Sequence, residues 1–251
     1  MNGRAGVQSV VLLLIGGTLI RTAWTGTYVR YVKPGLHWYL IAAGSVLVAV
    51  AAVNLARLFA TAARARHHEH QQHEHEDGDD GHGHGHSRLE PSWLLVAPAL
   101  ALLLVAPPAL GSYAASHGGT ALGAAASSDF PPLPDGDPVR VSLLEYASRA
   151  VFDKGQSLQR RTVAMSGFIV VDGDKRYLTR MIITCCAADA RPVKVGLTGA
   201  VPPSTTADSW LEVTGTYTPQ TDPDPIDGEP IPYLAVTAAH PIPTPKQPYE
   251  S

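Results

Sequence analysis

The chain has 251 residues, of which 45% are apolar and 16% are charged, and its formal net charge is −3. This length allows one or two domains. The mild acidity argues against nucleic acid as a partner, because nucleic-acid binding calls for a basic stripe that the sequence does not show. Two cysteines exclude a disulfide-dense scaffold and a zinc site built from four cysteines.

The N-terminal part contains three charge-free apolar stretches, at residues 5–20, 34–56 and 91–110. A membrane-spanning helix needs about 20 largely apolar residues, so the first stretch is short and also fits a signal peptide. It ends in a poor cleavage sequence, and a second apolar run follows soon after, which favours an uncleaved helix. The sequence therefore predicts two to three transmembrane helices in a multi-pass protein of the cell membrane.

Basic residues around these stretches predict the orientation of the chain. Five arginines flank the N-terminus and the second connection, at positions 4, 57, 64, 66 and 88, whereas the first connection carries Arg21, Arg30 and Lys33. Five against three favours a cytoplasmic N-terminus and an extracytoplasmic C-terminal domain.

A histidine-rich tract lies between the second and third apolar stretches. Its eight histidines alternate with six acidic residues: His67, His68, His70, His73, His75, His82, His84 and His86. Neutral imidazole binds zinc, nickel and copper, so the tract is a candidate for weak, reversible binding of a divalent transition metal. A solvated low-complexity linker without a binding role is the alternative interpretation.

The rest of the chain predicts a small all-β barrel preceded by a short helix over Val141–Phe152. Runs of alternating apolar residues indicate five strands, over 163–171, 177–185, 193–197, 211–217 and 231–236. Gly167 and Gly215 stand where a closed sheet must coil sharply, and the pattern fits an OB-like barrel. The predicted organisation is transmembrane helices in 1–66, a His-rich loop in 67–90, a third helix in 91–111, a linker in 112–138 and the barrel in 139–251.

The vicinal pair Cys185-Cys186 is the most particular feature of this domain. The two thiols could pack as small apolar groups, bind metal, or form a redox-active disulfide. If residues 185–189 form a turn, both thiols and Asp189 converge, with His240 as a candidate fourth ligand. Arg180 is a candidate ion-pair partner of Asp189.

The sequence shows no motif of a hydrolase, zinc protease or phosphate-binding loop, so we do not expect an enzyme. The acidic cluster at positions 222, 224, 227 and 229 lies among prolines, which favours a solvated loop over a calcium site.

Several motifs together resemble the YcgQ-type permease-subunit family. They are the apolar helices, the His-rich connection, Gly167-Phe-Ile-Val, Arg180 with Thr-Cys-Cys-Ala-Ala-Asp-Ala, Asp208-Ser-Trp-Leu-Glu-Val-Thr-Gly-Thr and Pro241 to Pro248-Tyr249. The resemblance implies a two-component membrane complex with a larger YcgR-like permease, linked to zinc homeostasis. It also implies that Cys185, Cys186 and Asp189 form the family's signature, without assigning them a role.

These observations predict a non-enzymatic accessory subunit of a permease complex that handles a divalent metal. Its expected partners are the permease and the lipid bilayer, and its only expected cofactor is zinc or another divalent transition metal. Two alternatives remain: a membrane-tethered thiol oxidoreductase that uses Cys185-Cys186, and a structural membrane module whose His tract is incidental.

Overall fold

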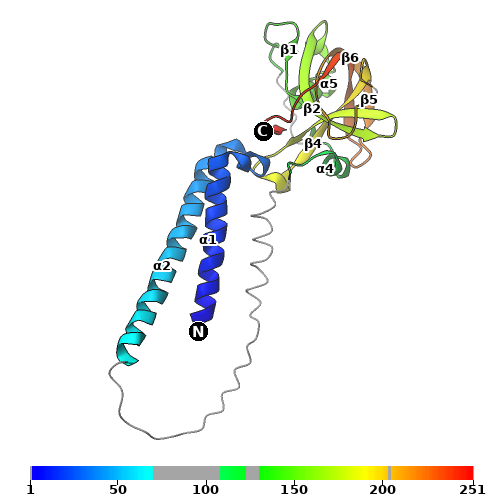
Figure 1. Ribbon diagram of the computed structural model, residues 1–251. Helices are drawn as coiled ribbons and strands as arrows, with labels where there is room; N and C mark the ends of the chain where they lie inside the picture. Colours follow the sequence, from blue (N-terminus) through cyan, green and yellow to red (C-terminus); the bar gives the residue numbers. More distant parts are fainter. Residues whose placement is uncertain (1, 70–107, 123–129, 203–204, 251) are drawn as a thin grey trace. The chain divides into compact units, whose positions relative to one another are not determined.

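A computed structural model describes residues 2–69, 108–122, 130–202 and 205–250 (Figure 1). The chain divides into two compact units. The first unit contains the N-terminal helices, and the second contains residues 108 onward together with the short segment Val29–Pro34. We call Val29–Pro34 the connector, because it lies between the two N-terminal helices along the chain.

The first unit is a pair of helices, α1 (Asn2–Thr25) and α2 (His37–Glu69). The two backbones approach closely at Gly16 and Gly44. A Cβ atom on Gly16 would lie 2.8 Å from the Gly44 carbonyl oxygen, and one on Gly44 would lie 2.9 Å from the Gly16 carbonyl oxygen. Small residues at a crossing point are typical of helix pairs in membranes, where van der Waals packing drives association.

Both helices are long and apolar enough to cross a membrane, over Gly6–Thr25 with a mean hydropathy of 1.5 and over Pro34–Thr61 with 2.1. Their outward residues include large apolar side chains such as Val46, Val50 and Phe59, which are exposed. Exposed large apolar side chains that recur along a helix indicate a surface covered by lipid or by another protein. The first two predicted spans are therefore present as apolar helices, whereas residues 91–107 of the third lie outside the described part of the chain.

The second unit is built on a five-stranded β-barrel: β2 (Thr162–Asp172), β3 (Lys175–Ile182), β4 (Arg191–Gly199), β5 (Trp210–Pro223) and β6 (Pro230–Pro241). The strands neighbour one another in the order β2-β5-β6-β4-β3, and β3 pairs with β2 to close the barrel. The β4–β6 pairing is parallel and the other four are antiparallel. Two short strands, β1 (Val139–Arg140) and β7 (Tyr249–Glu250), add parallel to β2 and β3.

The structure confirms the five strands predicted from apolar alternation. The alternating residues of a strand lie on two opposite faces, and both faces are buried. Val163, Met165 and Ile169 of β2 belong to the larger core, and Phe168 and Val170 belong to a second cluster on the opposite face. The two glycines also occupy crowded positions. A Cβ atom on Gly167 would lie 2.6 Å from the Thr179 carbonyl oxygen, and one on Gly215 would clash with the Ala235 carbonyl oxygen beside a register shift in β5.

The predicted helix is α5 (Leu143–Val151), which is amphipathic and contacts the barrel through a buried face. Ser142 caps it by accepting a hydrogen bond from the Glu145 amide at 3.0 Å. Leu143 and Tyr146 are fully buried, and the Tyr146 hydroxyl donates to the Tyr233 carbonyl oxygen at 2.6 Å. The helix therefore extends the barrel core.

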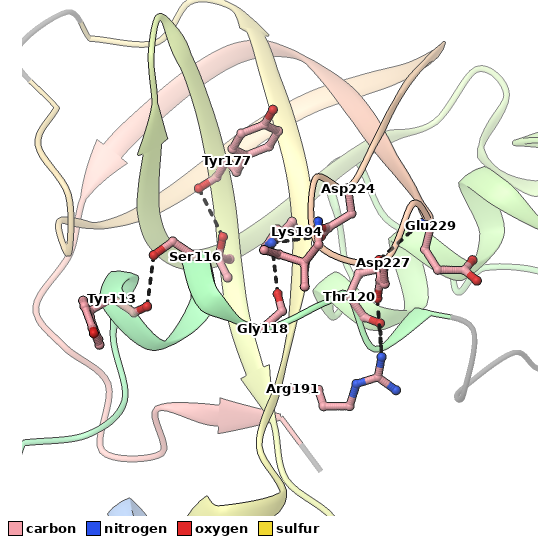
Figure 2. A network of polar contacts seen from close by, with 12 residues as sticks. Tyr113, Ser116, Gly118, Thr120, Tyr177, Arg191, Lys194, Asp224, Asp227 and Glu229 are labelled. Carbon is pink, nitrogen blue, oxygen red and sulfur yellow. Dashed lines mark hydrogen bonds and ion pairs between the residues drawn. The ribbon is translucent and has the colours of Figure 1, made fainter.

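Residues 112–122 differ from the linker that the sequence predicts. They begin with the helix α4 (Ser112–His117) and continue along β4, with Ala115 and Leu122 buried. Lys194 of β4 donates to the Gly118 carbonyl oxygen and forms a buried ion pair with Asp224 at 2.8 Å (Figure 2). Arg191 donates to the Thr120 carbonyl oxygen at 2.8 Å. Polar contacts to backbone groups thus attach a segment whose Gly- and Ala-rich sequence carries little apolar pattern.

Candidate thiol–carboxylate site

The two cysteines lie in the loop between β3 and β4, not at the end of a strand. The sequence predicts a strand through Cys185, but β3 ends at Ile182. The Asp189 carboxylate accepts hydrogen bonds from the amides of Thr184 (3.0 Å) and Cys185 (2.8 Å), and this turns the chain away from the sheet. The short helix η6 (Ala187–Asp189) completes the turn.

This turn brings the two thiols and the carboxylate together, as the sequence predicts for a turn at this position. The Sγ atoms of Cys185 and Cys186 are 3.7 Å apart, and both thiols are free. One ligand atom from each of Cys185, Cys186 and Asp189 lies within 4.8 Å of the others. Cys185 is exposed and the other two residues are half-buried, so the group is open to solvent.

Hydrogen bonding to the Asp189 side chain favours the protonated form of the neighbouring Cys185 thiol. A hydrogen bond to the Asp189 carboxylate, followed by one to the Cys186 thiol, raises the pKa of Cys185 to about 11. The pKa of Asp189 is lowered in turn, first by the hydrogen bond from the Cys185 side chain and then by backbone amides. At neutral pH the site therefore holds a protonated Cys185 thiol beside an ionised carboxylate. A reactive cysteine needs the opposite shift, toward the thiolate.

The connector contacts the same loop through its backbone. The Lys33 amide donates to the Cys185 carbonyl oxygen at 3.0 Å, and the Ala187 amide donates to the Tyr31 carbonyl oxygen at 2.7 Å. Between these bonds, Val32 forms an antiparallel bridge with Cys186. Sequence reasoning did not find this contact, because nothing in the connector's residue types indicates a partner far along the chain.

Two other predicted participants stay outside the group. His240 is exposed near the end of β6, with Glu212 as its register partner, and is not among the converging donors of the described residues. Arg180 does not pair with Asp189. It lies 3.7 Å from the Glu250 carboxylate and its guanidinium stacks over Trp210 at 5.0 Å. Its position in β3 directs it toward β7, away from the loop.

The histidine tract remains a prediction. His67 and His68 fall in the last residues of α2, but their side chains are outside the description, and the other six histidines lie in residues 70–107, which are not described.

The fold and the loop define a class of protein in which two apolar helices of membrane-spanning length precede a five-stranded β-barrel that carries a thiol–carboxylate cluster. The chain carries both domains of the DUF1980 family, with the N-terminal domain matching residues 7–121 and the C-terminal domain matching residues 148–250. No curated protein and no solved structure matches the chain.

Proposed function

We propose that this protein is a non-enzymatic accessory subunit of a membrane permease complex, and that it binds a divalent transition metal, zinc first, through Cys185, Cys186 and Asp189. The observation that carries the proposal is the 3.7 Å separation of the two Sγ atoms. Two thiolates on a tetrahedral zinc ion, each bonded at about 2.3 Å, stand about 3.8 Å apart. A disulfide would require a sulfur–sulfur distance of about 2.05 Å.

The donor set suits exchange of a metal more than permanent storage. Two sulfurs and one carboxylate supply three ligands, so a fourth tetrahedral position is left for water or for a donor from a partner. Cys185 is exposed, which gives such a partner access. A subunit that collects a metal ion and passes it on needs this combination of soft ligands and an open position.

The remaining parts of the chain support an accessory role in a membrane. The helix pair supplies an anchor, and the described parts of both candidate spans carry few charged groups that could form a solute pathway. We therefore propose a larger permease of the YcgR-like type as the partner, in contact with the lipid bilayer. The His tract at 67–86 would concentrate metal ions on the other side, since the chain crosses once between connector and tract.

We also propose that the barrel is of the OB type. The closed order β2-β3-β4-β6-β5 corresponds to the first, second, third, fifth and fourth strands of the barrel in sequence order, with the third and fifth parallel. This is the arrangement of a five-stranded Greek-key barrel. In this chain its loop between the second and third strands would carry the metal ligands.

Zinc titration calorimetry on the full-length protein in detergent tests the proposed site. We expect deletion of residues 67–86 to leave one tight site, and Cys185→Ser with Cys186→Ser in that background to abolish it. His240→Ala is the matched control, because His240 is an exposed potential ligand outside the cluster. Tight binding that survives loss of both cysteines would refute the cysteine site.

An experiment on whole cells tests the thiol oxidoreductase alternative. Thiol trapping followed by mass spectrometry should find both cysteines reduced in cells under oxidising and reducing conditions. A reversible Cys185–Cys186 disulfide in that experiment would favour the redox function instead.

A further inference from the structure

We infer that metal binding to the cysteine loop, the segment 183–190 between β3 and β4, stabilises the contact of this loop with the connector. We call this contact, between Tyr31–Lys33 and Cys185–Ala187, the clasp. This inference rests on the proposed function, because it assigns a regulatory consequence to that metal site.

The ligands and the connector contacts belong to the same residues. Cys185 offers its side chain to the metal and its carbonyl oxygen to the Lys33 amide, while Cys186 offers its side chain to the metal and bridges to Val32. Ala187 follows directly and donates its amide to Tyr31. A metal that fixes both thiols therefore also fixes the backbone groups that hold the connector.

Without metal, the loop is held by the hydrogen bonds from the Thr184 and Cys185 amides to Asp189 and by little buried surface. None of the residues of η6 is buried, and Cys185 is exposed. The contact with the connector is a single isolated bridge flanked by two hydrogen bonds. Segments with few buried apolar contacts and solvent-accessible hydrogen bonds open locally at low free-energy cost. Binding of an ion at three side chains can therefore shift the equilibrium toward the closed clasp.

A second attachment of the connector does not involve the metal ligands. The Tyr249 hydroxyl donates to the Arg30 carbonyl oxygen at 2.9 Å and accepts a hydrogen bond from the Leu110 amide at 2.9 Å. This contact keeps Arg30 on the barrel when the loop opens. The response to metal should consequently be confined to Tyr31–Lys33 and the cysteine loop.

The connector is covalently continuous with both candidate membrane spans. Lys33 is followed immediately by Pro34, where the second candidate span begins. Because Arg30 stays attached to Tyr249, opening or closing of the clasp changes the restraint on the start of the second candidate span. Coupling is reciprocal, so a change that loosens the connector must also weaken metal binding by the same factor.

Hydrogen exchange of the full-length protein, resolved to single amides and measured with and without zinc, tests the coupling directly. We expect zinc to slow exchange of the Lys33 and Ala187 amides at least about fivefold, the lower end of typical coupling between sites. The Leu110 amide, bonded to Tyr249, should exchange at the same rate in both states. Calorimetry in the same buffer reports whether zinc binds.

A pair of substitutions at one position tests the reciprocal effect. Lys33→Pro removes the amide that donates to Cys185, and we expect it to lower zinc affinity at least about fivefold. Lys33→Ala keeps the amide and should bind zinc as the natural sequence does. If zinc does not bind at all, the proposed function fails. If zinc binds but neither Lys33 nor Ala187 gains protection, and both variants bind equally, the clasp is refuted while the metal site stands.

Discussion

The Asp189 side chain has two roles in the cysteine loop. It forms the turn by accepting two backbone amides, and it places a negative charge beside the Cys185 thiol. A thiolate at this position is disfavoured unless a cation is present to balance it. The same arrangement that suppresses a free nucleophile therefore suits a metal site, in which the ion replaces the thiol proton.

Zinc affinity should consequently depend on pH. The raised pKa of Cys185, about 11, means that its proton must leave when metal binds, whereas the lowered pKa of Asp189 means that the carboxylate releases none. Because protons compete with the metal, affinity should rise about tenfold per pH unit for each displaced proton between pH 6 and pH 8. Calorimetry in buffers of different ionisation enthalpy counts the protons released. Affinity that is constant over this range would show that Cys185 is not a ligand.

The environment of Asp224 differs from the solvated loop that the sequence predicts. The sequence favours a solvated acidic loop, because four acidic residues lie among prolines. In the structure Asp224 is buried and pairs with the buried Lys194. Lys194 lies on β4 and Asp224 lies in the loop between β5 and β6, so the pair holds this loop against β4. Removing one partner would leave a buried charge without a counter-charge. Neither residue has a local pattern that indicates the other.

At the scale of elements, the contact between α1 and α2 depends on two glycines, although the sequence shows several. Gly16 faces the Gly44 backbone, but a Cβ atom on the adjacent Gly17 would meet nothing within 4 Å. Adjacent residues on a helix point in directions about 100° apart, which explains why one is essential to packing and the other is not.

Gly16→Val should therefore separate the helices, whereas Gly17→Val should not. Forcing a side chain into a close-packed contact costs about 1–3 kcal/mol, and both variants change helix propensity equally. Titration of the detergent-solubilised protein with SDS, followed by helical circular dichroism, measures the loss of helix stability. Equal midpoints for the two variants would contradict the observed crossing point.

The difference at the end of β3 has a clear cause at this scale. Alternation of apolar residues continues through Cys185 in the sequence, but hydrogen bonds from the Thr184 and Cys185 amides go to Asp189 instead of to a neighbouring strand. A local side-chain acceptor competes with the sheet for these amides. The alternation of apolar residues carries no information about this competing acceptor. The prediction of a strand through Cys185 was therefore wrong at its end, because β3 ends at Ile182.

For the whole molecule, the connector constrains the topology. The connector and the barrel belong to one compact unit, and the connector joins the two candidate spans. If the two helices cross a membrane, we expect the connector and the barrel to lie on the same side of it. The distribution of basic residues predicts that this side is extracytoplasmic.

Membrane-impermeant thiol labelling in intact cells tests this topology. In a background with Cys185→Ser and Cys186→Ser, we expect labelling of Arg30→Cys in the connector and of Ile226→Cys, an exposed barrel position. Asn2→Cys should be labelled only after the membrane is permeabilised. Labelling of Arg30→Cys and Ile226→Cys from opposite sides would contradict the shared unit.

Local patterns in the sequence were sufficient to determine the apolar helices, the five strands and the short helix before them. Each of these depends on the spacing of apolar residues within one segment, which burial of a single face imposes. The proximity of Cys185, Cys186 and Asp189 was open from sequence, because it required a turn that alternation argued against.

Only the tertiary structure decided which distant segments meet. The pairing of β2 with β5, the Lys194–Asp224 pair and the binding of Tyr31–Lys33 to the cysteine loop all join residues without a local signal for one another. The connector contact is made by backbone groups, which every residue carries, so it does not require particular residue types that could be recognised in the sequence. That contact becomes visible only when the folded barrel presents the cysteine loop to the connector.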